Sequence, residues 1–257
     1  MTEGGFGVSS RWGKRLSPLV AMATLVGGLF ALGGQAFANV TAVTGSAYGV
    51  SANISLFGGQ QPPFGPAPRV TLPSGGSTII TASAPSENVT YGPAQFFSSG
   101  KETVTTKGSI GTSGSVTSTT SIASATQPAG TCLGTQTSCI YAGPFTATSI
   151  ASSCTATQTA VSGKTTFVTG KLVTATDTNG NPTTTVAIPA NPPANDTISG
   201  YLYAGTTDKE TFTWIFNQQK VNADGSITVT AAHQILIGPT AKGDLYIGQA
   251  VCGVTKG

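Results

Sequence analysis

The sequence predicts an all-β protein, an antiparallel β-sandwich or barrel-like fold, that follows an N-terminal helical signal peptide. Two observations on residues 39–257 lead to this prediction. Short segments rich in Val, Ile, Thr and aromatic residues alternate apolar and polar side chains with the period of a strand. Gly, Pro and Asn turn residues separate these segments, and none keeps a helical period over three turns, so many short antiparallel strands are expected.

Residues 1–38 have the three parts of a secretory signal peptide. A basic region comes first, with Arg11, Lys14 and Arg15. The apolar run "LSPLVAMATLVGGLFALGG" follows, and Ala36 and Ala38 then suit a signal peptidase, so cleavage is expected between Ala38 and Asn39. An uncleaved membrane anchor is the alternative, because the run is nearly long enough to span a bilayer. The mature chain, residues 39–257, is expected to form a single β-sandwich domain.

The expected strands follow one another along the mature chain. Their approximate bounds are 48–58, 68–73, 77–83, 101–126, 164–177, 183–189, 200–205, 211–221, 227–237 and 243–253. Asn179-Gly180 and Asp224-Gly225 are strong hairpin signals between them. The proline clusters within 60–68 and 188–196 predict loops or sheet edges, because proline cannot donate a hydrogen bond to a ladder.

The stretch 107–127 allows two interpretations, because it consists almost entirely of Ser, Thr and small residues. Its Ile and Val positions keep some strand alternation, which favours strands that belong to the domain. A flexible linker is the alternative. With the loop between Cys132 and Cys139, this stretch forms a distinct Ser/Thr-rich part of the domain near 107–145.

Four cysteines in an exported chain predict two disulfides. Cys132 and Cys139 flank a short loop and are expected to close it locally, and Cys154 would then pair with Cys252. No C-x-x-C motif is present and the chain has one histidine, so neither a zinc site nor another metal or cofactor is expected.

The charge balance argues against two classes of partner. Removal of the signal peptide takes away three of the 12 basic residues and one of the nine acidic ones, which leaves a net charge of +1. Nucleic-acid binding needs clustered Lys and Arg, and anionic lipid surfaces attract the same clusters, so neither partner is expected. No membrane span is expected in the mature chain.

His233 is the only histidine, and it lies in "ITVTAAHQILI". With period two it shares a face with Val229, Ala231 and Ile235, which favours a structural histidine at the margin of the core. A catalytic histidine needs a nucleophile and an orienting acid, and the G-x-S-x-G elbow is absent. Asp208 and Glu210 are interpreted as a solvated strand entry rather than a catalytic carboxylate pair. No catalytic residue is therefore assigned.

Five aromatic residues alternate on two neighbouring expected strands: Tyr201, Tyr203, Phe212, Trp214 and Phe216. If the two strands pair, these rings could form a candidate ligand platform for stacking sugar rings. They could equally form the sandwich core, because large aromatic side chains dominate core burial. The interpretation as core is favoured, and the platform remains the alternative.

Several short motifs occur in an order that resembles a known family. They are "AYGVSANISLFG", "PFGPAPRVTLPSGG", "ASSCTA", "IPANPPANDTI", "VNADGSITVTAAHQIL" and "GDLYIGQAVCG". In this order they are similar to the choice-of-anchor P family of exported actinobacterial surface proteins. The resemblance implies a surface module without catalytic residues. The family's C-terminal anchor is not seen after "CGVTKG", and the Cys132–Cys139 loop and "TFTWIFNQQ" depart from the pattern.

The first functional hypothesis is therefore a non-enzymatic, secreted or cell-surface β-protein with a structural or adhesive role. The second is a carbohydrate-binding module that uses the strand of Trp214. A secreted hydrolase is the third and has the least support. The expected location is extracellular or associated with the cell wall, and the expected partner is a cell-wall polymer, a glycan or a second copy of the chain, through exposed strand edges.

Overall fold

The computed structural model describes residues 39–91, 94–128, 131–132, 139–140, 143–204 and 208–257. The predicted signal peptide, with Ala36 and Ala38, lies outside the described residues, so cleavage before Asn39 stays a prediction. The described residues contain strands and turns without helices, which confirms the all-β prediction. They belong to one compact unit.

A main sheet and a second sheet contain nearly all of these strands. In spatial order the main sheet comprises β2 (Gly59–Gln60), β1 (Val40–Leu56), β20 (Ala241–Lys256), β19 (Ile227–Ile237), β18 (Asp208–Val221), β17 (Asp196–Ala204), β15 (Lys171–Thr176), β12 (Phe145–Ala147), β9 (Ala125–Gln127), β6 (Ala94–Ser99) and β5 (Glu87–Tyr91). At its margins, β3 (Phe64–Thr71) pairs with β1 and β16 (Pro182–Ala187) pairs with β15.

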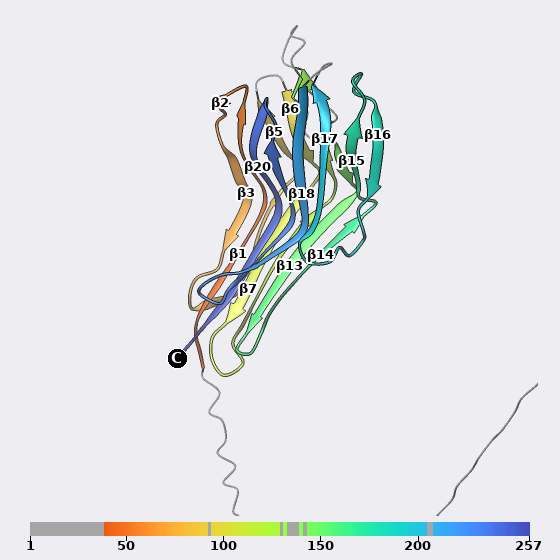
Figure 1. The fold of residues 1–257 in the computed structure, drawn as a ribbon. Coiled ribbons are helices and arrows are strands. Elements are labelled where there is room, and N and C mark those ends of the chain that lie inside the picture. Colours follow the sequence, from red (N-terminus) through yellow and green to blue (C-terminus); the bar gives the residue numbers. More distant parts are fainter. Residues whose placement is uncertain (1–38, 92–93, 129–130, 133–138, 141–142, 205–207) are drawn as a thin grey trace, which may run out of the picture. The chain divides into compact units, whose positions relative to one another are not determined.

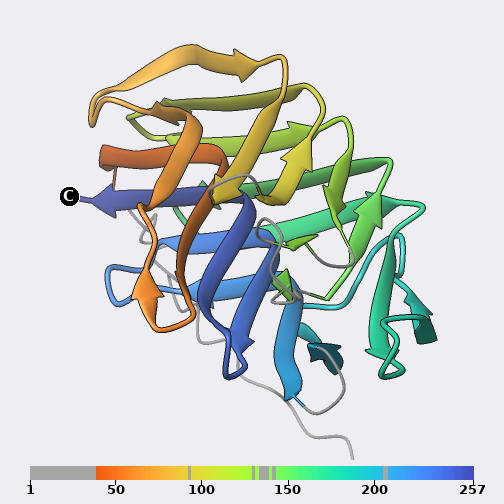
Figure 2. The same ribbon diagram turned by 90° about the horizontal axis from the view of Figure 1, so that it is seen from above.

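The second sheet is antiparallel and contains β14 (Val161–Val168), β13 (Ser149–Thr157), β8 (Ser115–Ile122), β7 (Glu102–Ser109) and β4 (Gly76–Ala84). A two-residue ladder joins β10 (Thr131–Cys132) to β11 (Cys139–Ile140). Figure 1 and Figure 2 show the second sheet layered over β1, β20 and β19. The main sheet is mixed rather than purely antiparallel, because β15 and β17 pair in parallel at Ala175 and Tyr201.

The described residues form three apolar clusters, and two of them contain most of the buried side chains. The aromatic core is enclosed where the main sheet curls over itself, so that Phe145 of β12 reaches Trp214 of β18 at a ring-centroid distance of 4.9 Å. The disulfide core lies between the two sheets and contains Val116, Cys154 and Cys252. The result is a sandwich at one end and a half-barrel at the other.

Along four central strands, the set of alternate side chains that points into the domain changes to the other set. The change occurs at the same level on all four strands, between the two cores. On β20, Leu245 and Ile247 are buried before Gly248, whereas Ala250 and Cys252 are buried after it. The same reversal occurs on β1 at Gly49, on β19 at Ala231 and on β18 at Asn217. Gly248 and Asn217 adopt positive φ angles of 64° and 49°, so the chain turns its other face inward without a change of register on either side. We call this level the reversal line.

Buried hydroxyl groups of the second sheet lie against the reversal line. Ser152 donates to the carbonyl oxygen of Gly248 at 2.8 Å, and Ser118 donates to that of Val251 at 2.9 Å. Thr120 and Ser152 also form a hydrogen bond with each other at 2.8 Å. Buried carbonyl groups need such partners, so the Ser/Thr-rich stretch has a structural role. Residues 115–122 form strand β8 rather than a linker.

The predicted disulfide between Cys154 and Cys252 is confirmed, and it joins β13 of the second sheet to β20 of the main sheet. Cys132 and Cys139 are directly opposite each other in the β10–β11 ladder. Their side chains lie outside the described part of the structure, so their pairing stays a prediction. The two predicted hairpins are confirmed, with Gly180 and Gly225 at positive φ between paired strands.

Glu102 is a buried carboxyl group beside the reversal line. It is 0% exposed, Oε1 accepts a hydrogen bond from Ser99 at 2.6 Å, and Oε2 has no partner among the described residues. Oε2 occupies the space that a side chain at position 49 would need, which explains Gly49. Burial raises the pKa of Glu102 from 4.5 to about 7, and the carboxylate of Glu87 adds to this while the Ser99 hydrogen bond opposes it.

The stability of the protein is therefore expected to fall with rising pH. The pKa of Glu102 is raised in the folded state, so its contribution is complete below pH 4.5 and is lost as pH rises through about 7. The expected loss by pH 8–9 is about 3 kcal/mol of unfolding free energy. Urea titrations between pH 4.5 and 9 measure it. Glu102→Gln should remove most of this dependence, whereas Glu87→Gln should keep most of it, because burial is the larger cause of the raised pKa. Equal slopes for wild type and Glu102→Gln would contradict the assignment.

Candidate functional site

The structure corrects the candidate aromatic platform. Phe212, Trp214 and Phe216 are buried in the aromatic core, with exposures of 1%, 0% and 0%. The predicted pairing of their strand with that of Tyr201 and Tyr203 is present, but Tyr201 lies opposite Thr211 and Phe212 lies opposite Gly200. Residues opposite each other share a face, so the two tyrosines lie on the other side of the sheet. The five rings therefore do not form one surface.

Tyr201 and Tyr203 lie on the outer face of the main sheet, which is the face turned away from the aromatic core. Their rings meet edge to face at 5.9 Å, and the Lys209 ammonium lies 4.6 Å from the centre of the Tyr201 ring. Tyr201 is 37% exposed. The cation covers part of the aromatic surface, so this cluster is a small exposed patch and not an open stacking platform.

His233 also lies on the outer face, in the middle of β19, and each of its ring nitrogens has a partner. Nε2 is 2.7 Å from Asp244 Oδ1, and Nδ1 is 3.1 Å from Gln218 Oε1. The ring stacks on Tyr246 with a centroid distance of 4.2 Å and an interplanar angle of 17°. The expectation of a structural, hydrogen-bonded histidine agrees with this geometry. Its face differs from the predicted one, because the reversal line puts Val229 on the inner face and His233 on the outer face.

These residues border a polar groove on the outer face, which we call the His233 groove. Its volume is about 360 Å³, within the range of small-ligand sites. It is lined by Gln218, Lys220, Asn222, Thr228, Thr230, His233, Tyr246 and Gln249. Thr230 is 1% exposed, and its hydroxyl accepts a hydrogen bond from Gln249 Nε2 at 3.1 Å. The lining therefore consists mainly of amide, hydroxyl and aromatic groups.

The groove belongs to a row of side chains that crosses five strands next to the reversal line. The paired positions in this row are Arg69, Tyr48, Gln249, Thr230 and Gln218, on β3, β1, β20, β19 and β18. With neighbouring strands about 4.8 Å apart, the row is about 19 Å long. Burial, with the neighbouring Tyr246, raises the pKa of the Tyr48 phenol far above its ordinary value, so Tyr48 is a neutral hydroxyl in this row.

This arrangement is suited to hydrogen bonding rather than to nucleophilic chemistry. A catalytic histidine uses one ring nitrogen for an orienting acid and the other for a nucleophile. Asp244 occupies the first position at His233, but an amide, Gln218, occupies the second. His233 therefore has the orienting acid of a catalytic triad, but its other ring nitrogen faces an amide instead of a hydroxyl or thiol group.

Glu210, which was interpreted as part of a solvated strand entry, is in fact buried. It is 2% exposed and accepts the backbone N–H groups of Thr240 at 2.9 Å and Ala241 at 3.4 Å, so it closes the loop between β19 and β20. The side chain of Asp208 lies outside the described residues. Glu210 therefore binds backbone N–H groups inside the domain and does not face a cleft.

The described residues contain no group of three or more His, Cys, Asp and Glu side chains that could hold a metal ion. In the same ranges, no helix is long and apolar enough to cross a membrane.

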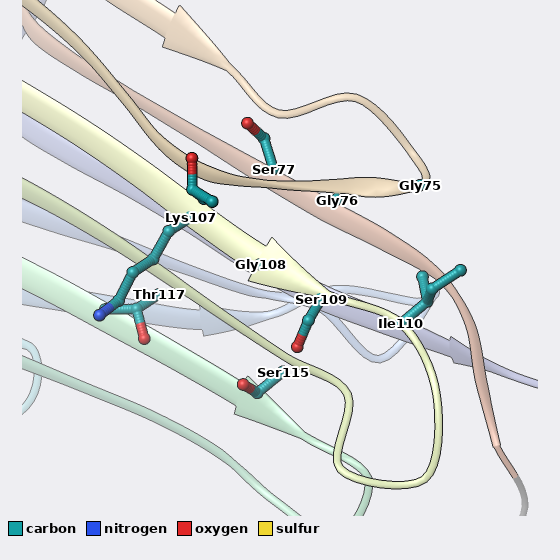
Figure 3. A pocket seen from close by; sticks show the side chains of 10 residues that line it. Gly75, Gly76, Ser77, Lys107, Gly108, Ser109, Ile110, Ser115 and Thr117 are labelled. Atoms are coloured by element: carbon teal, nitrogen blue, oxygen red, sulfur yellow. The ribbon is translucent and has the colours of Figure 1, made fainter.

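A second groove lies beside the β7–β8 hairpin and the start of β4. Its volume is about 530 Å³, and Gly76, Lys107, Ser109 and Thr117 are among its lining residues. Figure 3 shows the Lys107 side chain extending towards Thr117, with Ser109 farther along the hairpin. The exposed lining lacks a buried polar group or an aromatic ring that would fix the orientation of a ligand, so the His233 groove is the better defined site.

Comparisons with protein-family models, with curated proteins and with solved structures find no match to this chain. The candidate site therefore depends on its geometry. The sequence signalled His233 but not Tyr246 or Gln249, because glutamine and tyrosine on a strand carry no spacing signature of their own.

Proposed function

We propose that the protein is exported and acts at or outside the cell surface as a non-enzymatic structural or adhesive module, as its resemblance to choice-of-anchor P proteins implies. The observation that supports this most is the outer face of the main sheet, where the His233 groove presents amide and hydroxyl groups. Such groups hold a polar polymer through many individual hydrogen bonds. The Cys154–Cys252 disulfide fits an oxidising, extracellular environment.

The bonding of His233 favours an adhesive over a hydrolytic role. Hydrolysis with a histidine as the base needs a free ring nitrogen that can take a proton from a nucleophile or water. Both nitrogens of His233 are held by neighbouring side chains, which stabilises the ring in one orientation. The groove is then a fixed surface rather than a reactive one.

Binding to cell walls without their degradation is the expected result. The purified exported protein, mixed with insoluble cell walls, should sediment with them while the supernatant gains no soluble sugars or peptides. Protein unfolded by heat and reductant is the control for non-specific sedimentation. Release of soluble fragments by wild type, lost in His233→Ala, would instead establish a hydrolase. Complete recovery of folded wild type in the supernatant would refute the adhesive role.

A further inference from the structure

We infer that the outer face, from Arg69 through the His233 groove to Lys220, binds an acidic polysaccharide, whose hydroxyls meet the amide row and whose carboxylates meet the two cations. This inference rests on the proposed adhesive function and names the ligand class of the same surface. It follows from three observations: the charge on this face, the hydrogen-bonding atoms of the groove that no described residue uses, and the way the aromatic rings are covered.

The outer face is basic although the whole mature chain is almost neutral. Exposed basic side chains on this face are Arg69, Lys209, Lys220 and Lys242. One acidic side chain lies in their midst, Asp244, whose Oδ1 is 2.7 Å from His233 Nε2, so four cations surround a single carboxylate. Two other acids, Glu102 and Glu210, are buried inside the domain. Burial of these acids leaves cations in excess on this surface, which attracts an anionic polymer.

Two amide side chains, one on each side of Thr230, have hydrogen-bonding atoms that no described residue uses. Gln249 uses Nε2 to donate to Thr230, which leaves its Oε1 as an acceptor. Gln218 meets His233 through Oε1, which leaves its Nε2 as a donor. A donor on one side of Thr230 and an acceptor on the other match two hydroxyl groups of a sugar chain, because each hydroxyl can accept and donate a hydrogen bond. Lys220, one position farther along this face of β18, makes no ion pair with a described residue.

The aromatic rings argue against a neutral sugar as the main ligand. Recognition by stacking requires an open ring face. His233 covers one face of Tyr246 at 4.2 Å, and Lys209 lies over Tyr201. The row is about 19 Å long, with a cation, Arg69, at one end and Lys220 beside the other. Affinity on this surface therefore comes from charge and hydrogen bonds along an extended chain.

Calorimetric titration of the exported protein with oligogalacturonate tests this inference. Its fully methyl-esterified form is the neutral counterpart, and polyglutamate is the polyanion without sugar hydroxyls. Oligogalacturonate should bind more tightly than either, and its affinity should fall several-fold at high salt. Lys220→Gln should weaken it about fivefold, as expected for one exposed charge pair, and Gln249→Leu about tenfold through lost hydrogen bonds.

Lys164→Gln is the matched control, because Lys164 is exposed on the outer face of the second sheet. It should leave the affinity unchanged. Equal binding of the esterified oligomer or of polyglutamate, or an equal effect of Lys164→Gln, would overturn the inference. If wild type sediments with cell walls but ignores oligogalacturonate, the ligand class is wrong and the adhesive function stands. If it does neither, both proposals fall.

Discussion

Loss of the Cys154–Cys252 disulfide is expected to lower the unfolding free energy by about 4–5 kcal/mol, because the bond closes a loop of about 100 residues in the unfolded chain. The two cysteines are 98 residues apart, and both are buried, with exposures of 1% and 0%. The double variant Cys154→Ala/Cys252→Ala should therefore melt roughly 10–20 °C below wild type. Differential scanning calorimetry and urea titration at pH 6 measure the two quantities.

Val254→Ala is the control for this experiment. Val254 packs against the disulfide core but is only partly buried, so its truncation removes apolar contacts without opening a cross-link. The expected cost is about 1 kcal/mol. If the double cysteine variant loses no more stability than Val254→Ala, the disulfide does not constrain the unfolded state as argued. Reduction of wild type by dithiothreitol should reproduce the effect of the double variant.

Trp214→Ala is expected to destabilise the protein by about 3–5 kcal/mol, as for other large-to-small changes in a core. Trp214 is fully buried between Phe145, at 4.9 Å, and Phe216, whose ring is parallel to it at 5.7 Å. The folded fraction of the Trp214→Ala variant should bind cell walls as wild type does, because the indole is buried in the aromatic core and is not part of the outer face. Urea titration and the sedimentation assay measure the two effects separately.

Two variants sharpen this prediction. Tyr201→Ala removes an exposed aromatic ring from the neighbouring strand and should cost less than 1 kcal/mol. Trp214→Phe keeps a ring in the stack but loses buried volume, which destabilises the core. It also removes an N–H group that has no partner among the described residues, which offsets part of this loss, so the expected net cost is about 1 kcal/mol. A folded Trp214→Ala protein of wild-type stability with lost wall binding would restore the aromatic platform that the structure rules out.

Prediction from the sequence succeeded where the signal is local. The hairpins at Asn179-Gly180 and Asp224-Gly225 were recognisable because a tight turn requires particular residues at particular positions. The strands at 211–221 and 227–237 were recognisable from their alternation. Strand β13, "SIASSCTAT", was not expected as a full strand, because Ser and Ala give little contrast between its two faces.

The candidate site was only partly predictable. His233 stood out because it is unique, but its partners come from β18 and β20, 15 and 11 residues away. Its expected face was also wrong, since a strict period of two carries Val229 and His233 to the same side. The reversal line separates them, and the positive φ angles of Asn217 and Gly248 lie on neighbouring strands rather than on β19 itself.

By itself the sequence determined the all-β class and the turn positions, and it led to the expectation that Cys154 pairs with Cys252, because these depend on alternation, turn residues and cysteine spacing. Only the tertiary structure decided which face each side chain occupies. A shift of one residue in pairing, or one reversal along a strand, moves every later side chain to the opposite face. That is why Trp214 is in the core, Glu102 is buried beside Gly49, and His233 lies with Tyr246 and Gln249 on a polar outer surface.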